Sequence, residues 1–133
     1  MVLPPRHLLR HEAPPDDLLL LVRGGINGLS DVVLDRSVAD CWEEHGFFGV
    51  SVFAAPGDDL IALSRTNPAI ALRRQLRTAR VGPLRQAKFE VAATFTRPGH
   101  YSIVLPEATT AVFESLRSCF SEPIDNPGFR PDR

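Results

Sequence analysis

The sequence predicts a compact α+β domain in which a mixed or antiparallel sheet of about five strands packs against short helices. Its 133 residues, 44% hydrophobic and 23% charged, are typical of one globular domain with its own core. Apolar or β-branched runs alternate along the chain with short amphipathic segments. Several expected strands also follow one another directly, which disfavours a doubly wound parallel sheet.

Both ends of this single domain, residues 1–133, are rich in proline. Residues 1–17 hold four of the 12 prolines, and residues 121–133 hold three more. Proline fixes its own φ and restricts the residue before it, so we expect both segments to be extended arms.

The first strand is expected over residues 18–23, "LLLLVR", whose continuous apolar run predicts burial on both faces. Glycines 24, 25 and 28 follow and end it. A helix is expected over residues 35–46, because its apolar positions share one helical face. Asp35 is its expected N-cap and Gly46 its expected stop.

The second strand is expected over residues 47–55, "FFGVSVFAA", which are aromatic and β-branched. Asp58 or Asp59 then caps a short helix, and Asn67 with Pro68 opens another that contains Ile70, Leu72 and Leu76.

Three strands and a helix complete the expected fold. The strands are predicted over residues 78–84, 89–95 and 101–105, the last two separated by the turn signal Pro98-Gly99. Residues 109–120 space their apolar side chains as one stripe of an amphipathic helix, which we expect to pack on the sheet.

The net charge of −1, from 15 basic and 16 acidic residues, gives no global attraction to nucleic acid or to an anionic membrane. Local attraction stays open, because seven basic residues gather within 24 positions. They are Arg65, Arg73, Arg74, Arg77, Arg80, Arg85 and Lys88. Such a run is either a solvated helix face or a phosphate contact.

The two cysteines, Cys41 and Cys119, lie far apart and show no metal-ligand spacing. They are typical of reduced thiols, so we expect a cytoplasmic protein. No apolar run approaches the length of a membrane span, and no signal peptide is recognisable. We therefore expect no membrane partner and no metal site.

Polar residues interrupt three of the expected strands. Arg23 closes the first, Ser51 lies within the second, and His100 precedes the last. Two interpretations fit Arg23: an edge arginine paired with an acid, or a guanidinium held beside an anionic ligand that Gly24 and Gly25 let approach. Ser51 is not in a nucleophile elbow, because no Gly-x-Ser-x-Gly surrounds it.

The chain resembles a known family in the order of three features: Arg23, then "GVSVF" (residues 49–53), then "HYSIVLP" (residues 100–106). It comprises small intracellular effector toxins of type VI secretion with an ADP-ribosyltransferase-like fold. That family shows Gly-Thr-Ser-Val-Phe and His-Tyr-Thr-Ile followed by a proline. Arg23 matches the arginine of the Arg-Ser-Glu class of ADP-ribosyltransferases, and the resemblance spans roughly residues 18–120.

The resemblance implies a toxin that binds NAD as substrate and transfers ADP-ribose to a macromolecular acceptor. It implies Arg23, Ser51, His100 and Glu90 as catalytic residues. On chemical grounds, Arg23, Gly24, Gly25 and Ser51 suit the pyrophosphate or ribose of NAD, and Phe47, Phe48 or Phe53 suits stacking on nicotinamide, with Phe53 the expected contact. A cognate antitoxin or immunity protein is the implied partner.

The sequence departs from the family at two places. Val50 stands where the family has threonine. The Glu-x-Glu or Gln-x-Glu pair that supplies the class's catalytic glutamate is missing, so Glu90, the sole late-strand glutamate, is the candidate.

Two other functions stay open. One is a ribonuclease-like toxin using His100, Arg23 and the basic segment. The other is a non-catalytic interaction module of an immunity or antitoxin type, in which Arg23 and the aromatic residues form an interface.

Overall fold

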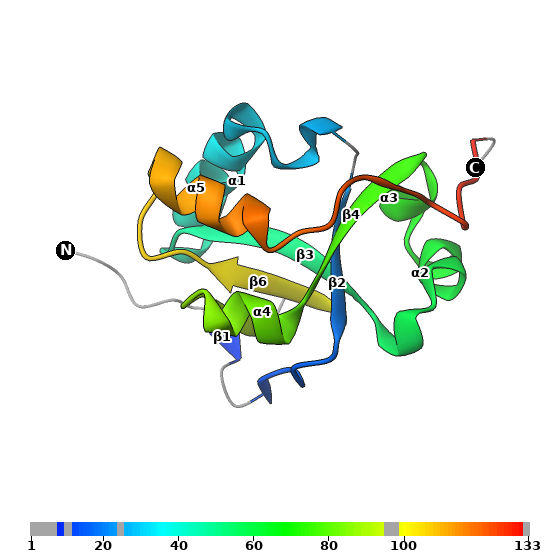
Figure 1. Cartoon of the computed structure of the whole chain (residues 1–133), viewed down its shortest axis with the longest axis horizontal. Coiled ribbons are helices and arrows are strands. Elements are labelled where there is room, and N and C mark those ends of the chain that lie inside the picture. The colour runs from blue at the N-terminus through cyan, green and yellow to red at the C-terminus, as the bar shows by residue number, and fades with distance from the viewer. Residues whose placement is uncertain (1–7, 10–11, 24–25, 95–98, 132–133) are drawn as a thin grey trace.

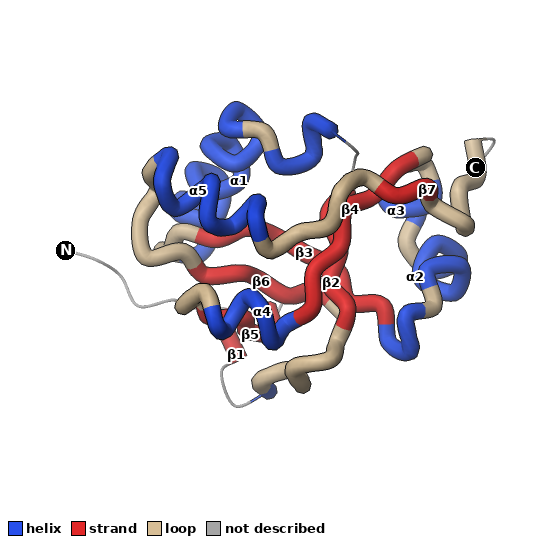
Figure 2. The backbone as a smooth tube through the Cα atoms, in the orientation of Figure 1, coloured by secondary structure: helices blue, strands red, loops and turns tan. Residues whose placement is uncertain are grey.

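Seven strands form one antiparallel sheet in the computed structural model, which describes residues 8–9, 12–23, 26–94 and 99–131 (Figures 1 and 2). Their order across the sheet is β1-β5-β6-β3-β2-β4-β7. The strands are β1 (Leu8–Leu9), β2 (Leu19–Arg23), β3 (Gly49–Ala55), β4 (Gln75–Arg80), β5 (Glu90–Thr94), β6 (His100–Val104) and β7 (Ile124–Asp125). The helices among these residues are α1 (Asp31–His45), α2 (Leu60–Thr66), α3 (Pro68–Ala71), α4 (Val81–Gln86) and α5 (Thr110–Ser118), with 3₁₀ turns η2 (Ile26–Leu29) and η3 (Pro56–Asp58).

The expected α+β class is confirmed, and the sheet is antiparallel rather than mixed. The strand count is higher than the expected five. The additions are the two edge strands, β1 beside β5 and β7 beside β4. Each has only two residues, too few for an alternating pattern to reveal it.

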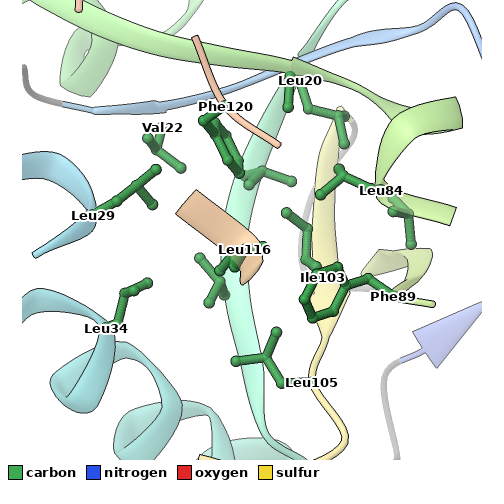
Figure 3. Packing of buried hydrophobic residues seen from close by; sticks show 14 of the residues in the cluster. Leu20, Val22, Leu29, Leu34, Leu84, Phe89, Ile103, Leu105, Leu116 and Phe120 are labelled. Carbon is green, nitrogen blue, oxygen red and sulfur yellow. The ribbon is translucent and has the colours of Figure 1, made fainter. Parts of the chain in front are cut away.

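The larger core cluster lies on the first face of the sheet, under α1, α4 and α5 (Figure 3). Leu116 and Phe120, from α5 and just after it, pack over β3 and β6, and Leu84 of α4 joins them. Leu34 brings α1 into the same cluster. The expected packing of the C-terminal helix on the sheet is confirmed.

A smaller cluster lies on the second face, where α2 and α3 cover the β2–β4 end. Phe53 and Leu21 from the sheet meet Ile70 of α3 there. Leu20 and Leu21 are neighbours in β2, belong to different clusters and are both 0% exposed. Because successive strand residues point to opposite faces, the predicted burial of the first strand on both sides is confirmed.

The helix starts are partly as expected. Asp59 caps α2 by accepting a hydrogen bond from the Ala62 amide at 2.9 Å, and Gly46 ends α1 in the left-handed region at φ 80°. The expected N-cap Asp35 is wrong, because α1 begins four residues earlier and Ser30 caps it. Three of the first four residues of α1 are exposed, with Val32 69% accessible, so Leu34 alone marks the buried stripe in this turn.

The strand expected over residues 78–84 is wrong in its second half. β4 runs from Gln75 to Arg80, and residues 81–86 form α4. Pro83 explains the difference, because proline cannot donate a ladder hydrogen bond and is excluded from a central strand. Leu76, expected in the preceding helix, is a β4 residue, because α3 ends at Ala71.

The proline-rich ends are docked on the domain wherever the structure describes them. The Gly82 amide donates to the Asp16 carbonyl at 2.8 Å, and Arg85 forms an ion pair with the Asp16 carboxylate. At the other end, Asn126 is 5% exposed, and the Arg130 amide donates to the Ala71 carbonyl at 2.7 Å. The described part of the C-terminal segment is therefore packed rather than a free arm.

Asn126 holds this segment through its side chain. Its amide nitrogen donates to the carbonyls of Ile70 and Arg73, both at 3.0 Å, and its amide oxygen accepts from the Gly128 backbone at 2.9 Å. We predict that Asn126→Ala lowers the free energy of unfolding by at least about 2 kcal/mol, because buried backbone groups lose their partners. Urea denaturation measures this. Exposed Asp125→Ala is the matched control and should change stability by less than about 0.5 kcal/mol; equal stability of both variants would contradict the role of Asn126.

Candidate functional site

The candidate site lies on the second face of the sheet, on the adjacent strands β2, β3 and β6. Ser51 of β3 pairs with Ser102 of β6, and Phe53 pairs with His100. Paired residues share a face, as do residues two apart in one strand. All four side chains therefore lie on the face that carries the Phe53 cluster.

Ser51 is the only exposed residue of β3, since the other six are buried. An exposed hydroxyl within a buried strand marks a place where the second face is open to solvent. The hydroxyl is thus available to a ligand without rearrangement of the core.

His100 lies diagonally across from Ser51. Such neighbours on adjacent antiparallel strands are about 7–8 Å apart. The imidazole is packed edge-on against the Phe53 ring, with 5.5 Å between ring centroids, and His100 is 8% exposed. Ser51 and His100 therefore share a face, with Ser51 exposed and His100 buried.

Ser102 and Thr94 are polar residues of this face that the sequence interpretation missed. Their hydroxyls are 2.8 Å apart and buried, at 2% and 3% exposure. The signal was present in "HYSIV", where His100 and Ser102 alternate with apolar residues and so indicate a polar strip on one strand face.

Arg23 is the last residue of β2, and its backbone pairs with Leu76 of β4. The recorded β2–β3 register ends at Leu21 opposite Phe53. Arg23 and Ser51 lie two residues beyond this last pair, past the end of the β2–β3 pairing. The side chain of Arg23, and Gly24 and Gly25, lie outside the described residues.

Glu90 and Phe53 are less favourably placed than the resemblance implies. Glu90 pairs with Val104, two strands from β3 and one row away from Ser51. Strand spacing puts the Ser51 and Glu90 backbones about 12 Å apart, beyond hydrogen bonding. Phe53 is 9% exposed within the second cluster, so little of its ring is free to stack on a ligand.

The thiols offer no nucleophile near neutral pH. Burial, reinforced by the nearby Glu44 charge, raises the pKa of Cys41 to about 12. Burial also raises the pKa of Cys119. Both thiols are protonated at pH 7, and they belong to α1 and the end of α5, on the first face of the sheet.

No cluster of three metal-ligating side chains occurs in residues 8–9, 12–23, 26–94 and 99–131. Over the same ranges, the helices are too short or too polar to cross a bilayer.

Comparison of the chain with protein-family models, with curated proteins and with solved structures found no match in any of the three.

The two serines of the site differ in what they do for the fold, which gives a direct test. Ser102→Ala should cost about 1–3 kcal/mol, because the buried Thr94 hydroxyl loses its partner. Ser51→Ala should change stability by less than about 0.5 kcal/mol, since Ser51 is exposed. Thermal unfolding of both variants measures the difference. A large loss in Ser51→Ala would mean that the hydroxyl serves the fold and not a ligand.

Proposed function

We propose that the chain is a bacterial toxin with an ADP-ribosyltransferase-like fold, which binds NAD across β2, β3 and β6 and transfers ADP-ribose to a macromolecular acceptor. One observation carries the proposal: the three segments that resemble the effector family are distant in sequence and adjacent in the sheet. Their register puts Ser51 and His100 on one face.

The proposed binding chemistry divides between charge and hydrogen bonding. The Arg23 guanidinium supplies forked donors that suit the NAD pyrophosphate. The exposed Ser51 hydroxyl orients this arginine or the adjacent ribose. Gly24 and Gly25 allow the ligand to approach the backbone, because they carry no Cβ.

In the proposed transfer, the bond between nicotinamide and ribose C1′ breaks, and nicotinamide leaves with the bonding electrons. The acceptor's nucleophile then bonds to C1′ and gives its proton to a base. Glu90 is proposed to stabilise the positive ribose, and His100 is proposed as the base. Because NAD is a dinucleotide, it spans more than one row of the sheet, so Glu90 and Ser51 need not touch each other.

Ion pairing of arginines in the basic segment, residues 65–88, favours this proposal over ribonuclease activity. Arg80 is bidentate to Asp58, with both contacts at 2.7 Å, and Arg85 is paired with Asp16. These pairs neutralise part of the segment, which weakens its attraction to a polyanion. A cognate antitoxin or immunity protein that covers the second face is the proposed partner.

NAD binding is expected to raise the melting temperature. Ligand at about 100 times its dissociation constant adds roughly 2.7 kcal/mol to the folded state. Ser51→Ala should reduce the shift, whereas Arg36→Ala, an exposed arginine on α1 over the other face, should leave it unchanged. The absence of any shift or calorimetric heat at millimolar NAD would overturn the NAD proposal.

Toxicity gives a second test of the same proposal. In the transfer reaction itself, Glu90→Gln should abolish transfer while NAD binding persists. In cells, expression in a bacterium without a neutralising partner should slow growth, and Arg23→Ala should relieve this in a protein that remains folded. Undiminished toxicity of a soluble, folded Arg23→Ala protein would contradict a phosphate-binding role for Arg23.

A further inference from the structure

Two adjacent arginines of the basic segment, Arg73 and Arg74, follow α3. Arg80 and Arg85 form ion pairs, and the Arg77 Nε donates to the Ser121 carbonyl at 2.9 Å. Within the described part of the chain, Arg73 and Arg74 form no ion pair. The charge run that the sequence singled out therefore contains residues whose side chains bind other parts of the fold and residues, Arg73 and Arg74 among them, that form no ion pair in the described part of the chain.

Both arginines line a pocket between the end of α3, the start of β4 and the C-terminal segment. Its volume of about 560 Å³ is in the range of small-molecule sites. The lining residues are Leu72, Arg73, Arg74, Gln75, Asp125, Asn126 and Phe129. The pocket lies at the start of β4, and β2 separates β4 from the Ser51 strand β3. Its Gln75 is next to Leu76, the residue that pairs with Arg23.

Arg74 is oriented by an aromatic ring. Its guanidinium carbon lies 4.8 Å from the centroid of the Phe129 ring. A guanidinium held over a ring in this way keeps its N–H edge available for a second partner. Planar, forked donors of this kind match the oxygens of a phosphate.

The backbone beneath both arginines is also fixed. Asn126 donates its side-chain amide to the Arg73 carbonyl at 3.0 Å and its backbone amide to the Arg74 carbonyl at 2.8 Å. Because these bonds exist in the folded chain, little backbone ordering remains to be done when a ligand binds. Both arginine side chains are exposed, and they project from a backbone that the Asn126 bonds hold in place.

We propose that this pocket binds a nucleoside monophosphate, with its phosphate on Arg73 and Arg74. Two arginines against Asp125 leave one net positive charge, which suits a phosphate ester. The Asp125 carboxylate accepts hydrogen bonds from sugar hydroxyls. Leu72, 50% exposed, supplies an apolar wall for the base. The proposal does not depend on ADP-ribosyl transfer.

Calorimetry with AMP, ribose 5-phosphate, inorganic phosphate and adenosine tests this. AMP should bind, ribose 5-phosphate and phosphate should bind more weakly, and adenosine should give no heat. Arg74→Ala should weaken AMP binding about 10-fold, as expected for a lost charge-assisted hydrogen bond, and Arg74→Lys should restore it only in part. The matched control Arg36→Ala should bind AMP like the unaltered chain.

NMR shifts locate the ligand and separate this site from the NAD site. AMP should shift the signals of Gln75, Asn126 and Phe129, and NAD should still shift Ser51 and His100 in Arg74→Ala. No heat with AMP, or equal affinity in Arg74→Ala, would overturn the proposal. So would AMP shifts confined to Ser51 and His100, or binding of an acidic peptide in place of AMP.

Discussion

The two-sided burial of β2 is the constraint on which the rest of the structure depends. Leu20 packs into the first cluster and Leu21 into the second, and both are fully buried. Fully burying a leucine contributes about 1.5–3 kcal/mol, so each face of this strand needs cover. Helices from different parts of the chain, α1, α4 and α5 on one side and α2 with α3 on the other, provide it. β2 also ends at Arg23, so the element that organises the core positions the backbone of the proposed phosphate-binding residue.

The pairing register of the strands determines which face of the sheet each β3 side chain occupies. Because strand side chains alternate with a period of two, burying Val50, Val52 and Ala54 on the first face assigns Ser51 to the second. A slip of one residue between β3 and β6 would place Val52 on the open face and Ser51 in the core, which the buried cluster opposes. The exposed hydroxyl is therefore as firmly placed as the core itself, although it contributes little to stability.

Local signals were enough to predict several elements and failed where tertiary pairing decides the structure. The run before Arg23, the Asp59 cap and the Gly46 stop each carry their signal within a few residues, and all three are confirmed. The edge strands β1 and β7 gain their identity only from β5 and β4, so two residues of sequence could not reveal them. Pro83 was a readable signal against a strand over residues 78–84.

The candidate site was also predictable only in part from local sequence signals. Polar interruptions of apolar strands identified Ser51 and His100 from sequence, but their shared face depends on the β3–β6 register, which the sequence does not encode locally. Ser102 was detectable by alternation with His100. Its bond to Thr94 was not, because that contact joins two strands.

The C-terminal segment shows why proline content did not predict a free arm. Asn126, Pro127 and Gly128 form a turn. The Asn126 side chain donates to the Ile70 carbonyl in α3, and the Asn126 backbone amide donates to the Arg74 carbonyl just before β4. A Cβ at Gly128 would collide with Ser64 and lie 3.2 Å from the Leu60 carbonyl oxygen, so only glycine permits this approach to α2. The same approach brings Phe129 to Arg74 and closes one wall of the pocket. Packing of the tail and formation of the pocket are thus a single structural event. A change that releases the tail would open the pocket at the β4 edge, and the Ser51 face, on the far side of β2, would keep its register.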